Sequence, residues 1–321
     1  MPTEAAEPRR RLTWDQLPDG VGALITERTG PVRSAVSQEG GYSPGMASVL
    51  TTAHGRLFVK VASARQNAHS VELYRKEAAV SVALRAVRNE VPAPAYRWSV
   101  ETEIGDDTWV VLAFDAADGP GPRIPWQPAE LTEALDLVAA VGQVPAPDDP
   151  AIQPLAEMVF DEWHTVSSDD EVRRRVLALD SSGWLAPRVA DLAALADRWP
   201  EATDGTSLVH HDLRADNMVR AGGRLLAVDW PHARRGAPWV DLLGMMPSLA
   251  LEGGGDPEEV FTAHPVGAAA DPDAVTVAIA ALTGMFLERS VQPPPPGIPH
   301  VRAFQRDQGL VGLRWLQGRM S

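Results

Sequence analysis

Cysteine is absent from the 321 residues, which excludes disulfide bonds and cysteine-ligated zinc. The sequence also lacks any run approaching the roughly 20 apolar residues that a membrane-spanning helix needs. No apolar stretch follows the arginines at 9–11 to make a secretory signal. Positive charge is scarce: the formal net charge is −14, whereas a nucleic-acid binder needs a basic surface. These absences predict a cytoplasmic protein that binds neither a membrane nor a nucleic acid.

Two common enzyme motifs are missing as well. No G-x-x-x-x-G-K-[ST] occurs, which excludes a P-loop nucleotide site, and the histidines form no H-E-x-x-H pattern. Residues 41–45 (GYSPG) do fit G-x-S-x-G, the nucleophile elbow of hydrolases. The residue after Ser43 is Pro44, however, and proline has no N–H to offer an oxyanion hole. A predicted strand follows instead of a helix, so the hydrolase interpretation is rejected.

The composition indicates a globular chain of two lobes. Hydrophobic residues make up 45% and charged residues 22%, and 321 residues exceed what one hydrophobic core usually serves. Residues 1–20 are polar and predict a flexible arm. Residues 21–117 predict a β-rich N-terminal lobe that binds nucleotide, and 118–321 predict a mainly helical C-terminal lobe for catalysis and acceptor binding. The segment 118–122 (DGPGP) has the composition of a hinge between them.

Hydrophobic periodicity predicts the elements within each lobe. In the first lobe, β-rich runs at 48–51 and 57–61 form a hairpin, 71–87 forms a helix and 109–114 forms a buried strand. The second lobe contains six predicted helices: 128–141, 173–179, 187–199, 240–251, 272–289 and 301–316. Two short apolar runs, joined by a Gly-Gly turn, add a small β-patch at 218–228. The fold class is therefore α+β.

The segment 209–219 (VHHDLRADNMV) fits H-x-D-x-x-x-x-N, the spacing of a kinase catalytic loop. Asp212 would accept the proton of an attacking hydroxyl. Asn217 offers a neutral oxygen to Mg²⁺, and Asp229, at the end of an apolar strand, offers a charged one. Hard oxygen ligands in small number suit Mg²⁺, which completes its shell with water and phosphate oxygens. The alternative is that these residues only cap turns and end a strand.

This segment resembles the aminoglycoside phosphotransferase family, which includes choline-kinase-like small-molecule kinases. The resemblance implies a two-lobed, protein-kinase-like fold that uses Mg²⁺ with ATP or GTP. By position, Asp212 matches the catalytic aspartate and His210 the histidine that supports the loop. Asn217 and Asp229 match the two metal ligands, and Asp241 matches an acidic position expected to be structural.

Two departures from the family pattern are visible. Family members often have His-Pro-Gly where this chain has residues 214–216 (RAD), and residues 231–232 (PH) follow the magnesium aspartate in an unusual way. Neither departure removes a catalytic group. Both indicate a distinct subfamily, so the acceptor cannot be carried over from other members.

A kinase also needs a lysine that neutralises the α- and β-phosphates, held by a helical carboxylate. Lys60 lies within the apolar strand 57–61 (LFVKV), where a lysine is costly unless paired. The alternative is an edge strand on which Lys60 faces solvent. Glu77 is the predicted partner, in a stretch that resembles the family's Arg-Glu-Ala helix, and Glu72 is its competitor.

Two further loops are predicted to hold the nucleotide. The glycine-rich stretch 40–45 contains Gly41 and Ser43, whose small side chains allow backbone N–H groups to approach phosphate. Asp115 and Ala117 fall at the junction of the lobes, where main-chain groups would bind adenine.

The predicted activity is transfer of the γ-phosphate of ATP to a hydroxyl of a small polar, cationic acceptor, such as an aminoglycoside-like antibiotic or an amino sugar. Two alternatives stay open: a metabolic sugar or amino-alcohol kinase of the same fold, and a catalytically silent nucleotide-binding module. The cationic acceptor is suggested by the net charge of −14 and by acidic residues of the second lobe that could line a cleft. They are Asp161, Glu162, Glu252, Asp256, Glu258, Glu259 and Glu288.

Overall fold

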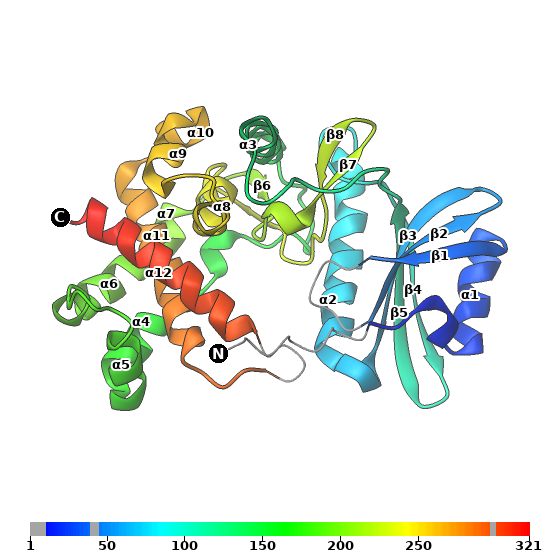
Figure 1. Ribbon diagram of the computed structural model, residues 1–321, viewed down its shortest axis with the longest axis horizontal. Helices are drawn as coiled ribbons and strands as arrows, with labels where there is room; N and C mark the ends of the chain where they lie inside the picture. The colour runs from blue at the N-terminus through cyan, green and yellow to red at the C-terminus, as the bar shows by residue number, and fades with distance from the viewer. Residues whose placement is uncertain (1–10, 39–44, 296–299) are drawn as a thin grey trace.

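A five-stranded antiparallel sheet forms the N-terminal part of the chain (Figure 1). The structure is a computed structural model, which describes residues 11–38, 45–295 and 300–321. The strand order is β1-β2-β3-β5-β4. The strands are β1 Val32–Ser37, β2 Met46–Thr52, β3 Gly55–Ser63, β4 Tyr96–Ile104 and β5 Asp107–Asp115. The predicted hairpin and the predicted buried strand are confirmed as β2–β3 and β5.

Helices cover both faces of this sheet. The 3-10 turn η1 (Trp14–Gln16) and α1 (Asp19–Thr29) pack on one face, and α2 (Ala64–Ala83), continued by η2 (Leu84–Val87), packs on the other. Because side chains alternate along a strand, Val59 and Val61 of β3 join the cluster under α1, whereas Phe58 and Ala62 join the cluster under α2. The same alternation turns Lys60 towards α2.

The helix predicted at 71–87 is confirmed as the longer part of α2 with η2. A short first part of α2 precedes it, separated by a kink at Asn67, whose φ of −163° and ψ of 99° are not helical. Ser63 is the N-cap of α2 and its side chain accepts a hydrogen bond from the backbone N–H of Gln66 at 3.2 Å. The polar residues that follow show too little apolar periodicity to reveal this first part of the helix.

The helical part of the chain confirms the six predicted helices, with small shifts of their ends. They correspond to α3 Pro128–Gln143, α5 Asp170–Leu177, α6 Val189–Ala196, α8 Val240–Leu251, α11 Pro272–Ser290 and α12 Val301–Arg319. Shorter helices lie between them: η3 Leu155–Glu157, α4 Glu162–Ser168, η4 Ala186–Arg188, α7 Trp199–Ala202, α9 Pro257–Ala263 and α10 Pro265–Ala268. They share one large hydrophobic core.

Two small sheets lie in the helical part, on the side nearer the large sheet (Figure 1). One pairs β6 (Ser207–Val209) with β9 (Arg234–Gly236), and the other pairs β7 (Met218–Ala221) with β8 (Arg224–Ala227). The chain runs from β6 through the 3-10 turn η5 (Ala215–Asn217) into β7, and from β8 into β9. The catalytic-loop motif therefore lies between the two sheets.

The architecture is the predicted α+β arrangement, with an antiparallel sheet in the N-terminal part and helices in the C-terminal part. In the described residues, no helix combines the length and the apolar character that crossing a membrane requires.

Candidate active site

Asp241, in the first turn of α8, fixes the backbone of the loop that follows β6. The two carboxylate oxygens of Asp241 accept the backbone N–H groups of His210 and His211, each at 2.7 Å. Asp241 is 4% exposed, and this burial raises its pKa to about 6 against the effect of the two hydrogen bonds. His211 adopts a left-handed backbone conformation, with φ of 65°. Both carboxylate oxygens of Asp241 are thus used to hold the backbone of the loop, which is a structural role.

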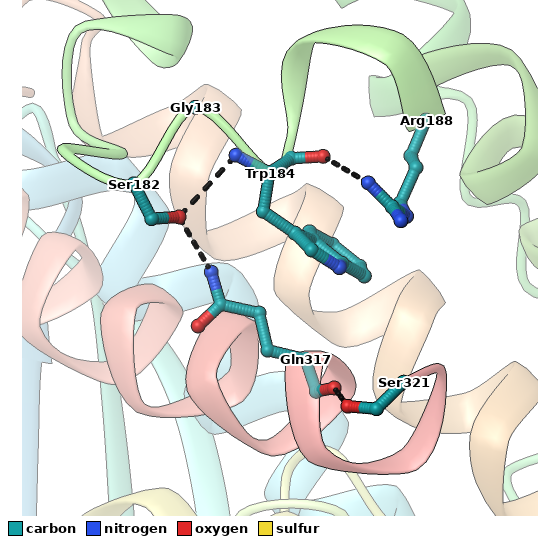
Figure 2. Close-up of a pocket in the computed structure, with 6 residues that line it drawn as sticks. All are labelled: Ser182, Gly183, Trp184, Arg188, Gln317 and Ser321. Atoms are coloured by element: carbon teal, nitrogen blue, oxygen red, sulfur yellow. Dashed lines mark hydrogen bonds between the residues drawn. The ribbon is translucent and has the colours of Figure 1, made fainter.

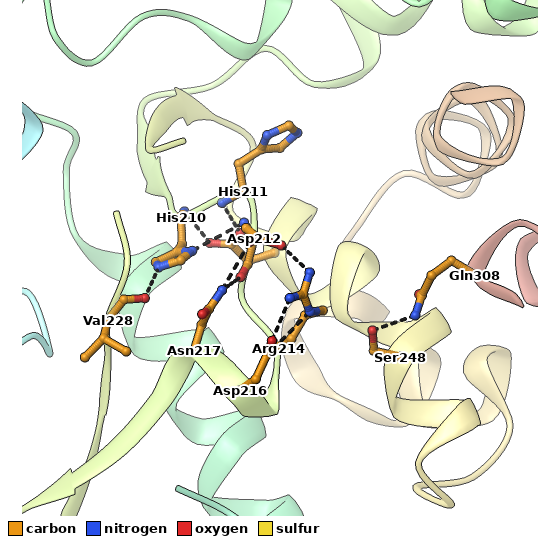
Figure 3. Close-up of polar contacts among 10 residues, drawn as sticks. His210, His211, Asp212, Arg214, Asp216, Asn217, Val228, Ser248 and Gln308 are labelled. Carbon is orange, nitrogen blue, oxygen red and sulfur yellow. Dashed lines mark hydrogen bonds and ion pairs between the residues drawn. The ribbon is translucent and has the colours of Figure 1, made fainter. Parts of the chain in front are cut away.

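His210 supports the loop as a neutral side chain. It is fully buried, which lowers its pKa to about 4. Its Nε2 lies 3.0 Å from the carbonyl oxygen of Val228, and its Nδ1 accepts the backbone N–H of Asp212 at 3.3 Å. These partners require the tautomer with the proton on Nε2. The ring also packs edge-on against Trp230, with centroids 4.4 Å apart. His210 therefore connects the catalytic loop to the strand end that carries Asp229 (Figure 3).

Asp212 and Asn217 contact each other within the loop. The amide nitrogen of Asn217 donates to the backbone oxygen of Asp212 at 2.8 Å and to its Oδ2 at 3.1 Å. The side-chain oxygen of Asn217 accepts no hydrogen bond from the described residues and is available as a ligand. The backbone oxygen of Asn217 accepts the N–H of Val228 at 3.0 Å, so Asp229 follows directly beside it.

Lys60 joins the two parts of the molecule. Its Nζ lies 2.6 Å from Glu77 Oε2 and 3.0 Å from Asp229 Oδ1, and 4.9 Å from the centroid of the Tyr74 ring. The structure therefore places Glu77, and not Glu72, against Lys60. Glu72 faces away and pairs with Arg75 on the surface.

Lys60 and Asp229 stabilise each other's charge, whereas burial, with the like charge of Asp229, raises the pKa of Glu77 to about 7. Burial works to lower the pKa of Lys60, but Asp229 and Glu77 outweigh it and raise that pKa above its usual range. Burial works to raise the pKa of Asp229, but Lys60 outweighs it and lowers that pKa. Lys60 is therefore a cation and Asp229 an anion at neutral pH.

Asp212 has the environment of a general base. Burial raises its pKa to about 6, Arg214 opposes that shift, and Asp216 and Asp229 add to it. A general base works best when its pKa lies near the operating pH, so this shift suits proton abstraction from a hydroxyl. Its side chain is 36% exposed, which leaves it accessible to an acceptor.

The donor set formed by Asn217 and Asp229 fits Mg²⁺. Asn217 has a free oxygen, and Asp229 brings a charged one. Within the described ranges, no three His, Asp or Glu side chains converge into a metal cage made by protein alone. One or two protein oxygens, with water and phosphate completing the octahedron, are what Mg²⁺ prefers.

The remaining predicted nucleotide residues are Gly41, Ser43, Asp115 and Ala117. Gly41 and Ser43 fall outside the described residues. Gly45, just after them, must be glycine because a Cβ there would overlap the carbonyl oxygen of Val61. Asp115 ends β5; its backbone N–H donates to the carbonyl oxygen of Ala95 at 2.9 Å, and its carboxylate accepts from Arg97, with Nη2 to Oδ2 at 2.8 Å.

Ala117 lies just beyond β5, between the two parts of the chain. Its N–H and C=O have no hydrogen-bond partner in the described part of the chain. The next residue, Asp118, donates its N–H to the carbonyl of Arg220 in β7 at 3.1 Å. The strand-to-helix crossover is therefore attached to the small sheet, with the main-chain groups of Ala117 left open.

Most of the acidic residues expected to line a cleft have structural partners. Glu162 pairs with Arg289 at 3.0 Å and is 7% exposed. Asp256 caps α9, and Glu258 pairs with Arg319 at 2.6 Å. Glu288 is buried and accepts a hydrogen bond from Gln292, and Asp161 and Glu259 are exposed on the surface.

Glu252 is affected by charges of the loop that contains Asp212. Burial raises its pKa, and the charges of Asp216 and Arg214 reach it. Its Oε2 accepts the indole N–H of Trp126 at 3.0 Å. Asp216, which sequence analysis did not single out as acidic lining, lies in the loop itself with 43% of its side chain exposed.

A surface hollow elsewhere in the helical part offers no comparable chemistry (Figure 2). Its lining consists of Ser182, Gly183, Trp184, Arg188, Gln317 and Ser321. None of these has a carboxylate side chain, and their polar groups bond to one another, as Gln317 does to Ser182 at 3.1 Å.

The Lys60–Glu77 pair allows a direct test. Lys60→Ala should raise the KM for nucleotide, and Glu77→Gln should do the same because both act through one buried ion pair. Their effects should overlap, with a coupling energy of about 0.5–3 kcal/mol in a double-mutant cycle on kcat/KM. Glu72→Gln is the matched control and should stay close to wild type. Additive effects of Lys60→Ala and Glu77→Gln would show that the two side chains act separately.

Solved kinases share this architecture. A thermostable mutant of aminoglycoside phosphotransferase APH(4)-Ia, in ternary complex with ADP and hygromycin B, is 15% identical; 92% of this chain and 98% of that chain are covered, with a TM-score of 0.58. Choline kinase LicA from Streptococcus pneumoniae is 14% identical, with 92% and 100% covered and a TM-score of 0.56. Amicoumacin kinase hAmiN, in complex with AMP-PNP, Ca²⁺ and Ami, is 14% identical, with 92% and 94% covered and a TM-score of 0.51. At these identities the likeness concerns the fold.

The fold and the site together define a small-molecule kinase of the protein-kinase-like class. The model of the phosphotransferase enzyme family (APH) matches residues 38–276, and the chain belongs to that family. A comparison with curated protein sequences finds no match.

Proposed function

We propose that this protein transfers the γ-phosphate of ATP to a hydroxyl group of a small cationic molecule, with Mg²⁺ as the metal. The observation that carries the proposal is the joint placement of Lys60, Asn217, Asp212 and Asp229. Lys60 reaches Asp229 across the two parts of the molecule at 3.0 Å, and Asn217 holds Asp212 in the loop. Nucleotides are also present in two of the kinases of the same fold compared above, ADP in one and AMP-PNP in the other.

Each residue has a defined task in this proposal. Asp212 accepts the hydroxyl proton of the acceptor and aims its oxygen at the γ-phosphorus. Lys60, held by Glu77, neutralises phosphate oxygens of the nucleotide. Asn217 and Asp229 would hold Mg²⁺, which supplies positive charge to the phosphate oxygens when bound. The open main-chain groups of Ala117 would bind the adenine edge.

The acceptor is proposed to be cationic because carboxylates dominate the surroundings of the catalytic base. Asp216 is exposed beside it, and the charge of Asp216 also reaches Glu252, whereas Arg214 is the cation that pairs with Asp212. A region of one sign of charge raises the local concentration of ligands of the opposite sign. Aminoglycoside-like antibiotics, amino sugars and amino alcohols all have this chemistry.

The proposal is tested by screening acceptors in two steps. Thermal stabilisation in the presence of Mg²⁺ and a nucleotide analogue finds candidates, since a ligand stabilises the fold by RT ln(1 + [L]/Kd). For a hit, kcat/KM is then measured from low to high salt. A cationic acceptor should lose efficiency as salt screens the carboxylates. If a sugar is phosphorylated and its kcat/KM does not change with salt, the acceptor is neutral and the protein is a metabolic sugar kinase.

A further inference from the structure

Arg214, two residues after the catalytic base, is clamped between two carboxylates (Figure 3). Its Nη1 lies 2.7 Å from Asp212 Oδ1, while its Nε and Nη2 bind the two oxygens of Asp216 at 3.0 and 2.8 Å. The side chain is 15% exposed. A guanidinium presents its donors in a rigid plane, so binding both carboxylates fixes how they are oriented relative to each other.

The guanidinium is also anchored to the C-terminal helix. Its Cζ lies 5.0 Å from the ring centroid of Phe304 in α12, a distance at which an aromatic ring attracts a cation. Gln308, one helical turn further on and on the same face of α12, donates to Ser248 Oγ of α8 at 2.9 Å, and both are buried. Helix α12 is therefore fixed where Phe304 meets Arg214.

This arrangement orients Asp212 without blocking it. Arg214 donates to one of its oxygens and Asn217 to the other. A carboxylate has about four lone-pair sites, so each oxygen can still accept one more hydrogen bond. The carboxylate is held against rotation and can still receive the proton of an acceptor hydroxyl.

Lys60, the other cation of the site, cannot take the place of Arg214. Lys60 is already bound by Glu77 and Asp229. Loss of the guanidinium would remove the cation that bridges the like charges of Asp212 and Asp216. Position 214 is also the first at which the loop departs from the family pattern described above.

We propose that Arg214 is a positioning residue for phosphoryl transfer, which holds the Asp212 carboxylate in its reactive orientation by tying the catalytic loop to α12 through Phe304. This inference rests on the proposed function, because it assigns Arg214 a task in that reaction.

The test compares Arg214→Ala and Arg214→Lys with Arg319→Gln. Arg319, on α12, is 13% exposed and pairs with Glu258, which makes it a control of similar burial far from the loop. Arg214→Ala should lower kcat by about 10- to 100-fold, the range of a hydrogen bond to a charged group. The KM for nucleotide should stay close to wild type. Arg214→Lys should recover only part of the loss because it lacks the planar fork.

Added guanidinium ion provides the readout that a merely structural role would not give. It should raise the kcat of Arg214→Ala and leave wild type and Arg319→Gln unchanged. The positioning role would be overturned if Arg214→Ala had a wild-type kcat. It would also be overturned if guanidinium did not restore the lost activity and Arg319→Gln showed the same loss. Neither result would affect the proposed function. Absence of transfer by the wild-type enzyme across the acceptor panel would instead overturn the proposed function.

Phe304→Leu covers the case in which Arg214→Ala does not fold. It keeps Arg214 and an apolar side chain but removes the aromatic face. It should lower kcat more than the nucleotide affinity, and by less than Arg214→Ala. An unchanged kcat in Phe304→Leu would overturn the link through α12.

Discussion

Asp212→Asn should lower kcat by about 10²- to 10⁴-fold, the usual contribution of a positioned acid or base. The substitution preserves the size of the side chain and removes its ability to take up a proton at neutral pH. The nucleotide should still bind, because Lys60, Asn217 and Asp229 are unchanged. Steady-state kinetics with a verified acceptor, together with nucleotide binding by calorimetry, separate the two effects.

Asp216→Asn is the matched control for this experiment. It changes a second carboxylate of the same loop, which also binds Arg214 but is 43% exposed and is not placed as the base. Its effect on kcat should be much smaller than that of Asp212→Asn. A wild-type kcat in Asp212→Asn, or equal losses in the two variants, would remove the base assignment.

Asp229→Ala should abolish productive use of the metal–nucleotide complex, with kcat/KM lower by about 10³-fold or more, since a metal ion supplies several kcal/mol of charge stabilisation. It also removes one of the two carboxylates that bind Lys60. Asn217→Ala should cost less, about 10- to 100-fold, because Asn217 offers a neutral oxygen. Magnesium titrations at fixed nucleotide measure both.

The control for the metal pair is Asp256→Asn, which exchanges one good helix cap for another at the start of α9. Its magnesium titration should overlay that of wild type. If the titrations of Asp229→Ala and Asn217→Ala also overlay it, neither side chain binds the metal.

The architecture could be predicted because its long elements have clear periodicity. The helix at 240–251 and the strand at 109–114 each contain enough apolar residues in register to be recognised without a partner. Helix α1 (Asp19–Thr29) could not, since its two glycines weaken the helical pattern and only three of its residues are buried. Strand β4 was missed because it is an edge strand with one face in solvent.

The site was predictable where residues lie close in sequence. The spacing from His210 to Asn217 is read directly from the chain, whereas the choice between Glu77 and Glu72 depends on how α2 rotates against β3. That rotation is set by the packing of residues such as Val71 and Tyr74 under the sheet. The contact between Arg214 and Phe304 joins segments far apart in the sequence, and a cation–ring contact of this kind has no sequence signal.

The central claim is transfer of phosphate to a hydroxyl of a small acceptor, and its most direct measurement is the product itself. Wild type and Asp212→Asn are incubated with Mg²⁺, ATP and each acceptor found by thermal stabilisation, and the acceptor is examined by mass spectrometry while ADP is quantified. The account predicts an acceptor heavier by one phosphate, formed in equal amount with ADP by wild type and strongly reduced in Asp212→Asn. Release of ADP and free phosphate with every acceptor unmodified, or a phosphorylated product formed equally well by Asp212→Asn, would contradict it.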